Sequence, residues 1–187
     1  MSSLKLLSRL RKYNDGDVEA YLKTQMRQNL KAIENALDSV QSCATRIYLS
    51  ENLTVYPNNS SEKINFDRIN YDSNLAFNLS LKRYECKKSG IYNASALTLV
   101  QGTNVLANIY SINMRKNGTF YSNGTYKKFT VTTSESLSYS DTVDLVIGDY
   151  VEFYVYGLGD NSVNGITLQA GDNGSNTYAS INWICDI

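Results

Sequence analysis

Two hydrophobic periodicities divide the chain, and each predicts a different kind of structure. Between Val18 and about Ala44 the sequence has no Pro and no Gly, and residues that favour helix predominate. Asn14 and Asp15, just before this stretch, offer side chains that can cap a helix N-terminus. Apolar residues then recur at alternating spacings of four and three, at Met26, Leu30, Ile33, Leu37, Val40, Ala44 and Ile47. The pattern predicts a helix over residues 14–45 with a heptad seam.

The seam is narrow, which favours contact with other helices. A helix that packs on its own domain usually has a broader apolar stripe, whereas polar residues such as Gln28, Asn29 and Lys31 flank this one. Two interpretations stay open, a short oligomeric coiled coil and a helix packed on another protein, and we favour the first. The coiled coil would place these residues in a contact between copies: Met26, Leu30, Ile33, Leu37 and Val40.

Beyond the helix, short alternating runs lie between turn signals such as Asn117-Gly118, Asn123-Gly124 and Gly148-Asp149. Candidate strands lie near residues 64–69, 76–85, 91–100, 105–115, 119–131, 136–147, 150–157, 164–169 and 177–186. In the clearest of them, Val151, Phe153 and Val155 point one way, and the other face carries Tyr150, Glu152, Tyr154 and Tyr156. So many short strands predict a mainly β protein with a sandwich or jelly-roll head over residues 64–187, joined by a linker at 46–63.

Composition excludes several classes of function. The 18 basic and 18 acidic residues cancel, so the basic surplus of a typical nucleic-acid binder is missing. The sequence has no His, which removes imidazole bases and His-ligated metal sites. Glu152 and the pair Asp141 and Asp144 have no nucleophile or base beside them in sequence. We therefore expect that the protein is not an enzyme and that it has neither a catalytic residue nor a cofactor.

Two acidic turns, residues 159–161 and 171–174, contain oxygen ligands of the kind that Ca²⁺ prefers. Their spacing matches no established calcium loop, so ordinary turns are the favoured interpretation and we expect no metal site. Cys43, Cys86 and Cys185 are widely spaced and odd in number, and we expect them to be buried thiols in a chain made in a reducing cytoplasm.

Residues 1–13 form a basic segment with its own small apolar face. Leu4, Leu7 and Leu10, or Leu6 and Leu10, can line one side of a short helix, and Arg9 and Arg11 are among its four positive charges. The charges interrupt the apolar core that a signal peptide needs, and no stretch of the chain is apolar enough for a membrane span. A frayed terminus, an anchor that folds on a partner, and a weak contact with a membrane surface are all open interpretations.

Four motifs in the head resemble those of one superfamily. Ser89-Gly90-Ile91-Tyr92 resembles the "G-x-Y" of complement-type globular heads and tumour necrosis factor-like jelly rolls, and residues 114–119 resemble their "K-N-G" hairpin. Gly148-Asp149-Tyr150-Val151 resembles the "G-D-x-V" turn, and residues 178–184 resemble the closing strand. The likeness runs from about residue 64 to residue 187, in the family's order, although the collagen-like stalk of many members is replaced by a short helix.

The resemblance implies a homotrimer that packs through aromatic faces near a three-fold axis, and so a trimeric coiled coil below it. Carried over to this sequence, it places these residues on the subunit contact: Tyr150, Tyr154, Tyr156, Tyr178 and Ser180. Such heads also cap trimeric fibres on bacterial and viral surfaces. With its anchor segment and helix, the chain looks like a bacteriophage virion protein, assembled in the host cytoplasm on capsid, portal or tail proteins.

Two functions remain in view. The first is a short fibre or appendage, anchored by residues 1–13, whose head projects and contacts the host surface. Tyr, Asn and Ser in exposed loops suit carbohydrate recognition, so a host surface glycan is a candidate partner. The second is a structural decoration or a tail or neck adaptor that binds no receptor. A cytokine-like ligand or a spore-surface protein is a more distant interpretation.

Overall fold

The computed structural model describes residues 15–40, 43–102, 109–128, 134–158 and 165–187, with side chains in the helix described for residues 18–33. The chain forms two compact units, Met1–Gln41 and Ser42–Ile187. We call the second unit the head. The predicted anchor residues Leu4, Leu7, Arg9, Leu10 and Arg11 lie outside the described residues, and so do the side chains of Leu37 and Val40.

The first unit contains one helix, α2 (Asp15–Val40). Lys23 and Glu19, one turn apart, form an ion pair of 2.7 Å on its surface. The seam is confirmed as an exposed apolar stripe, because the side chains of Met26, Leu30 and Ile33 are 63%, 56% and 61% exposed. These side chains are not buried within one copy of the chain, so the coiled coil stays a prediction.

Helix α2 ends at Val40, earlier than the heptad pattern predicts. The last two seam positions, Ala44 and Ile47, lie instead in strand β1 (Ala44–Tyr48), and Ile47 is buried in the head. Cys43, Thr45, Ile47 and Leu49 are all buried, and this period of two is the alternation of a strand. The sequence of residues 44–47 fits both the heptad spacing of a helix and the alternation of a strand. Hydrogen bonding of β1 to the last strand of the chain stabilises the strand.

The segment 46–63, predicted as a linker, is therefore part of the head. It contains the end of β1 and the short strands β2 (Leu53–Val55) and β3 (Ser60–Lys63). The sequence gives little signal for either strand, because β2 has three residues and β3 has the polar sequence Ser60-Ser61-Glu62-Lys63. Their place is fixed by neighbours far along the chain, since β2 pairs with β12 and β3 with β11.

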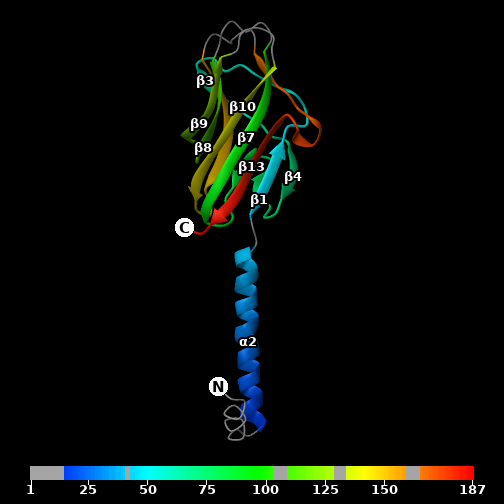
Figure 1. Cartoon of the computed structure of the whole chain (residues 1–187), viewed down its shortest axis with the longest axis vertical. Coiled ribbons are helices and arrows are strands. Elements are labelled where there is room, and N and C mark those ends of the chain that lie inside the picture. The colour runs from blue at the N-terminus through cyan, green and yellow to red at the C-terminus, as the bar shows by residue number, and fades with distance from the viewer. Residues whose placement is uncertain (1–14, 41–42, 103–108, 129–133, 159–164) are drawn as a thin grey trace. The chain divides into compact units, whose positions relative to one another are not determined.

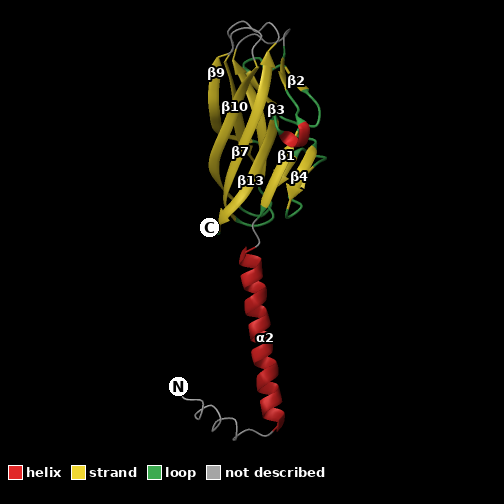
Figure 2. Cartoon of the chain, turned by 45° about the vertical axis from the view of Figure 1, so that its right-hand side comes forward, coloured by secondary structure: helices red, strands yellow, loops and turns green. Residues whose placement is uncertain are grey.

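The head is a sandwich of two antiparallel sheets, and Figure 2 shows them as two layers. Sheet A has the order β2-β12-β7-β13-β1-β4, with β10 paired to β7. Its further strands are β4 (Arg68–Asp72), β7 (Gly90–Gly102), β10 (Ser134–Leu145), β12 (Ile166–Leu168) and β13 (Thr177–Cys185). Figure 1 shows β10, β7, β13 and β1 side by side.

Sheet B has the order β5-β6-β11-β8-β9, with β3 paired to β11. Its further strands are β5 (Phe77–Asn78), β6 (Arg83–Glu85), β8 (Ile109–Lys116), β9 (Thr119–Lys128) and β11 (Tyr150–Leu158). The alternation predicted for β11 is confirmed, because Val151, Phe153 and Val155 are at most 2% exposed. A single 3₁₀ turn (Asp172–Gly174) precedes β13.

Aromatic rings fill the space between the sheets. Phe153 meets Phe66 and Tyr139 edge-on at centroid distances of 6.3 and 5.7 Å, and Tyr84 meets Tyr92 in the same way at 5.9 Å. Cys43 and Cys86 are buried thiols, as predicted. Cys185 is exposed, contrary to prediction, because the pairing of β13 with β7 shifts register between Trp183 and Cys185.

Two of the sequence motifs meet at one end of sheet B. The Asn117 side chain donates to Asp149 Oδ1 (2.7 Å) and its carbonyl oxygen accepts from the Tyr150 amide (2.9 Å). Asp149 Oδ2 accepts from the Val146 amide (3.0 Å) and lies 3.4 Å from Lys116 Nζ. Partial burial would raise the pKa of Asp149, but these hydrogen bonds and the lysine outweigh it and hold the pKa below its usual value.

We predict that the head loses stability in acid partly through Asp149. Its folded pKa is lowered, so its contribution is complete above the unfolded pKa of about 4 and is lost as the pH falls through the folded value. Asp149→Asn should lower the free energy of unfolding at pH 7 by about 1–3 kcal/mol and flatten its decline below about pH 4. Urea denaturation at pH 7 and pH 3 measures both effects.

Asp172→Asn is the matched control, since Asp172 is exposed in the 3₁₀ turn. It should leave stability at pH 7 close to that of the parent chain. If both variants behave alike at both pH values, the Asn117–Asp149 contact does not hold this end of the sheet.

Candidate functional site

Each sheet has an outward face, and the two faces differ in chemistry. The outward face of sheet B presents rings and charges from β11, β8, β6 and β3. Arg115 lies over the Tyr154 ring at 4.1 Å and Arg83 over the Tyr150 ring at 4.2 Å. Glu152, between these two tyrosines, pairs with Lys63 at 2.5 Å. Two of the tyrosine rings of β11, those of Tyr150 and Tyr154, are thus each covered by a neighbouring arginine.

Glu152 also organises the middle of this face. Its second oxygen accepts a hydrogen bond from the Tyr154 hydroxyl (3.0 Å), while Lys63 donates to the Leu81 carbonyl as well (2.8 Å). Burial and the adjacent carboxylate together raise the pKa of the Tyr154 hydroxyl, so this tyrosine stays protonated. The Glu152 carboxylate thus joins Lys63 and Tyr154 across neighbouring strands.

A hollow of about 410 Å³ lies beside this network, over the outward side of β8. It is lined by Ser61, Asn113, Phe120, Asn123, Tyr126, Tyr156 and Leu158. Phe120 and Tyr126 are 55% and 53% exposed, whereas Asn113 at its base is 1% exposed. The hollow therefore joins exposed rings to a polar base, and its lining carries no charged side chain.

Two bulges in β9 bring three of these side chains to one face. Asn113 pairs with Asn123 and Ser111 with Tyr126, so β9 uses one residue more than β8 over this step. A second shift between Met114 and Arg115 brings Phe120 opposite Arg115. In a regular strand, residues three apart point to opposite faces, whereas here residues 120, 123 and 126 all border the same hollow.

Asn123-Gly124, predicted as a turn, is the site of one bulge within β9. A Cβ on Gly124 would lie 2.2 Å from the Ser138 carbonyl oxygen and 2.9 Å from the Tyr139 Cα. Glycine is therefore required by the close approach of β10 and not by a hairpin. The sequence signal for this site was the run of aromatic and Asn residues from 120 to 126, which strand alternation alone assigns to both faces.

The outward face of sheet A carries little charge in its centre, on β7, β13 and β1, whereas Asp144 of β10 and Arg68 of β4 are exposed at its margins. Among the outward residues of β1, β13 and β7, the charged one is Arg46. Its guanidinium lies 3.8 Å above the Tyr178 ring, and it donates to the Gly174 carbonyl (3.4 Å). Ser180 is only 7% exposed, and the half-buried Leu97 of β7 lies opposite Tyr178.

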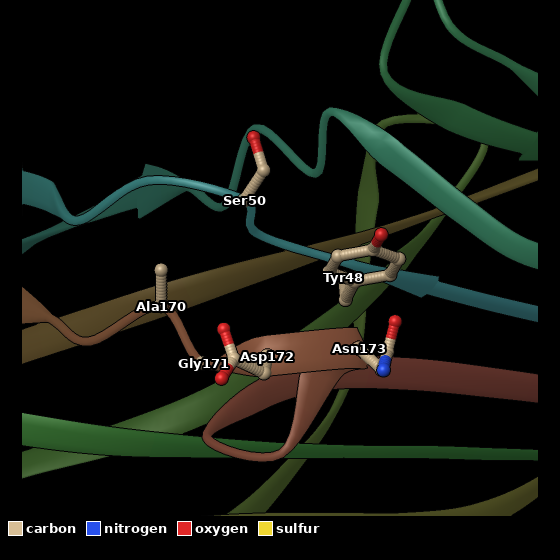
Figure 3. A pocket seen from close by; sticks show the side chains of 6 residues that line it. All are labelled: Tyr48, Ser50, Ala170, Gly171, Asp172 and Asn173. Carbon is tan, nitrogen blue, oxygen red and sulfur yellow. The ribbon is translucent and has the colours of Figure 1, made fainter.

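A second hollow, of about 560 Å³, lies at the end of β1. It is bordered by Tyr48, Ser50, Ala170, Gly171, Asp172 and Asn173, and Figure 3 shows these residues on two facing segments. Ser50 is turned to Asp67, whose carboxylate accepts from its amide (2.8 Å) and its hydroxyl (2.5 Å). Partial burial acts in the opposite direction, but these bonds hold the pKa of Asp67 below its usual value.

The residues predicted for the subunit contact do not share one surface. Tyr150, Tyr154 and Tyr156 face outward from sheet B, whereas Tyr178 and Ser180 face outward from sheet A. The two groups lie on opposite sides of the sandwich because outward faces of packed sheets point away from each other. Within α2, Met26, Leu30 and Ile33 form the separate exposed stripe described above.

The two acidic turns were predicted to be ordinary turns and not calcium sites. Residues 159–161 lie outside them, and the turn at 171–174 is the 3₁₀ element beside Tyr48. The described part of the chain has no cluster of three His, Cys, Asp or Glu side chains that could hold a metal ion. No helix within the described ranges has both the length and the apolar character needed to cross a bilayer.

Known structures provide the comparison that decides the fold. The chain is similar to the globular domain of zebrafish complement 1qA protein, with a TM-score of 0.53 and 14% identity over 76% of this chain and 95% of that one. The fold is that of the complement and tumour necrosis factor jelly rolls. Eiger TNF from S. frugiperda matches with a TM-score of 0.55 and 8% identity over 79% of this chain and 95% of its own.

Murine APRIL at pH 5.0 has the same jelly roll, with a TM-score of 0.56 and 8% identity over 76% of this chain and 99% of its own. No family model and no curated protein matches the sequence. At such low identity the likeness concerns the fold alone. It bears out the jelly-roll head that the four motifs predicted, and the functional assignment rests on the surfaces of this chain.

Proposed function

We propose that the chain is a bacteriophage virion structural protein, a homotrimeric short fibre anchored by its N-terminus, with a head that contacts the host surface. The observation that carries the proposal is the exposed seam of α2. Leu22, Met26, Leu30 and Ile33 are all more than half exposed in one copy. An apolar stripe of this kind is costly in water and is covered in a functional protein.

Copies of the same chain are the best candidates to cover the seam. Residues at a heptad spacing meet identical residues of parallel helices, because the spacing keeps the seam facing the partner along its length. The number three comes from the family resemblance of the head. A closed three-fold assembly also gives every subunit the same contacts, which leaves no seam uncovered.

In the head, the subunit contact that we propose is the outward face of sheet A. The centre of a protein interface is depleted of charge, and Arg46 is the charged side chain on the outward side of β1, β13 and β7. Burying sheet B instead would desolvate Arg83, Arg115, Lys63, Glu85 and Glu152, at a cost in free energy.

The virion setting is supported by the combination of parts. Residues 1–13 have a basic, leucine-bearing sequence that is too short to be a stable helix alone, which suits a segment that docks on another virion protein such as capsid, portal or tail. A decoration or adaptor protein that binds no receptor, which is the alternative function, does not require an open hollow. The hollow on sheet B, which the proposed trimer leaves uncovered, favours the fibre.

We predict that Tyr178→Ala weakens the trimer and Tyr154→Ala does not. Truncating an aromatic side chain at a buried contact costs about 2 kcal/mol or more, equivalent to a roughly 30-fold weaker association. Sedimentation equilibrium over a dilution series gives the dissociation constants, and thermal melting shows whether each head stays folded. If Tyr154→Ala dissociates and Tyr178→Ala does not, the contact is on sheet B.

The helix is tested by a pair of neighbouring substitutions. Leu30→Lys places a charge in the seam, whereas Asn29→Lys places the same charge beside it. The parent chain and Asn29→Lys should sediment at about three times the 21.0 kDa chain mass, and Leu30→Lys should shift towards smaller species at micromolar concentration. A monomeric parent chain would contradict the proposed fibre.

Removal of residues 1–13 tests the anchor. The shortened chain keeps α2 and the head, so it should remain a folded trimer by sedimentation and circular dichroism. It should no longer be incorporated into phage particles, measured by immunoblotting of purified virions against the parent chain. Incorporation at the parent level would place the anchor in α2 or in the head.

A further inference from the structure

We propose that the hollow over β8 on sheet B binds a neutral oligosaccharide. This inference rests on the proposed function, in which the head contacts the host surface, and it names the chemical class of that contact. The hollow is lined by Ser61, Asn113, Phe120, Asn123, Tyr126, Tyr156 and Leu158. The second hollow, at the end of β1, differs in that it carries the Asp172 carboxylate.

The lining has the two features that a sugar requires. Phe120, Tyr126 and Tyr156 supply flat apolar faces against which the C–H side of a pyranose ring can stack. Ser61, Asn113 and Asn123 supply neutral donors and acceptors for its hydroxyl groups. About 410 Å³ lies at the small end of the range for ligand pockets, which suits one or two sugar rings.

Two polar side chains on the outward face of β8 lack part of their hydrogen bonding, and one of them, Asn113, lines the hollow. Asn113 Nδ2 donates to Ser61 Oγ (3.0 Å), while Asn113 Oδ1 is buried without a partner. Turning the amide over would only exchange the unpartnered oxygen for an unpartnered nitrogen. Ser111 Oγ, next to it on β8, is also buried without a partner. Native proteins rarely leave such groups unsatisfied, so these atoms point to a ligand that carries hydroxyl groups.

The side chains above the base are free to admit that ligand. Phe120 and Tyr126 are each more than half exposed. Among the described residues, the Tyr126 hydroxyl has no hydrogen-bond partner, whereas Tyr139 behind β9 is fixed by a bond to Ser122 (2.7 Å). Rotation of these two exposed rings opens the route from solvent to Asn113 without a change in the core.

The charges of sheet B argue for a neutral ligand. Lys63 is paired with Glu152, and Arg83 with Glu85 at 2.9 Å, so these cations are already neutralised. Arg115 lies over Tyr154 with its Nε buried and without a partner, but it is not part of the lining of the hollow, which contains no cation. An acidic sugar would lose hydration without gaining a cation, whereas a neutral sugar exchanges hydroxyl bonds to water for bonds to Asn and Ser.

The test uses the full chain and two sets of immobilised oligosaccharides. The neutral set contains glucose, galactose and N-acetylglucosamine units, and the acidic set contains uronic or sialic acid. We expect binding to members of the neutral set, with an affinity for a free oligosaccharide in the millimolar to high micromolar range by titration calorimetry. Because a trimer presents three hollows, binding to the array should be stronger than binding of a single chain to the free sugar.

The variants are chosen so that they fold. Phe120→Ala and Tyr126→Ala remove exposed rings, and each should weaken sugar binding at least tenfold with the melting temperature and sedimentation mass unchanged. Tyr56→Ala is the matched control, since Tyr56 is 49% exposed in the loop after β2, outside the lining of the hollow and outside the strands of the proposed subunit contact, and should leave binding unchanged. Asn113→Ala should also weaken binding, because it removes the polar base of the hollow.

Three results of the binding measurements would overturn the inference. They are binding confined to the acidic set, equal binding by Phe120→Ala and Tyr56→Ala, and absence of binding to any neutral oligosaccharide at millimolar concentration. A fall in sedimentation mass for Phe120→Ala would also overturn it, because the hollow would then be a subunit contact. If the trimer still adsorbs to host cells without binding neutral sugar, the proposed fibre stands and this inference fails.

Discussion

The head depends on filling the space between two sheets with aromatic side chains whose polar atoms are satisfied. Tyr84, Tyr92 and Tyr110 are at most 1% exposed, so their rings contribute the apolar burial of phenylalanines while their hydroxyl groups need partners. Tyr92 donates to the Lys88 carbonyl, and Tyr139 shares a hydrogen bond with Ser122. These bonds fix strand positions as well as rings, since each joins a core ring to a backbone or strand at the margin of the sandwich.

The packed interior determines what the outside can do. Side chains alternate along a strand, so burying Val151, Phe153 and Val155 obliges Tyr154 and its neighbours on β11 to face solvent. On sheet B these outward residues are held by ion pairs and by arginines over rings, while the central strands of sheet A present mostly uncharged residues. This difference between the two faces is the basis for the proposed subunit contact on one and the proposed ligand site on the other.

The sequence predicted those parts of the structure in which a single period governs a long segment. The helix up to Val40 and the alternation of β11 followed directly from spacing, and the four motifs indicated the jelly roll. Spacing failed at Ala44 and Ile47, where heptad and strand periods both fit and long-range pairing with β13 decides. Spacing also failed to predict the bulges in β9. These bulges depend on how β8 and β10 pack against β9, and Gly124 is the only local sequence feature that marks them.

Because of the bulges of β9, the outward surface of sheet B can change without a change in the core. The orientation of Asn123 depends on how many residues β9 contains between two pairing points, and not on which residues they are. Loss of one residue there would remove a bulge and turn Asn123 away from its neighbours, while β8 and β11 kept their pairing. The side chains that this face presents can therefore change through small insertions and deletions, a route that substitutions in the tightly packed interior do not offer.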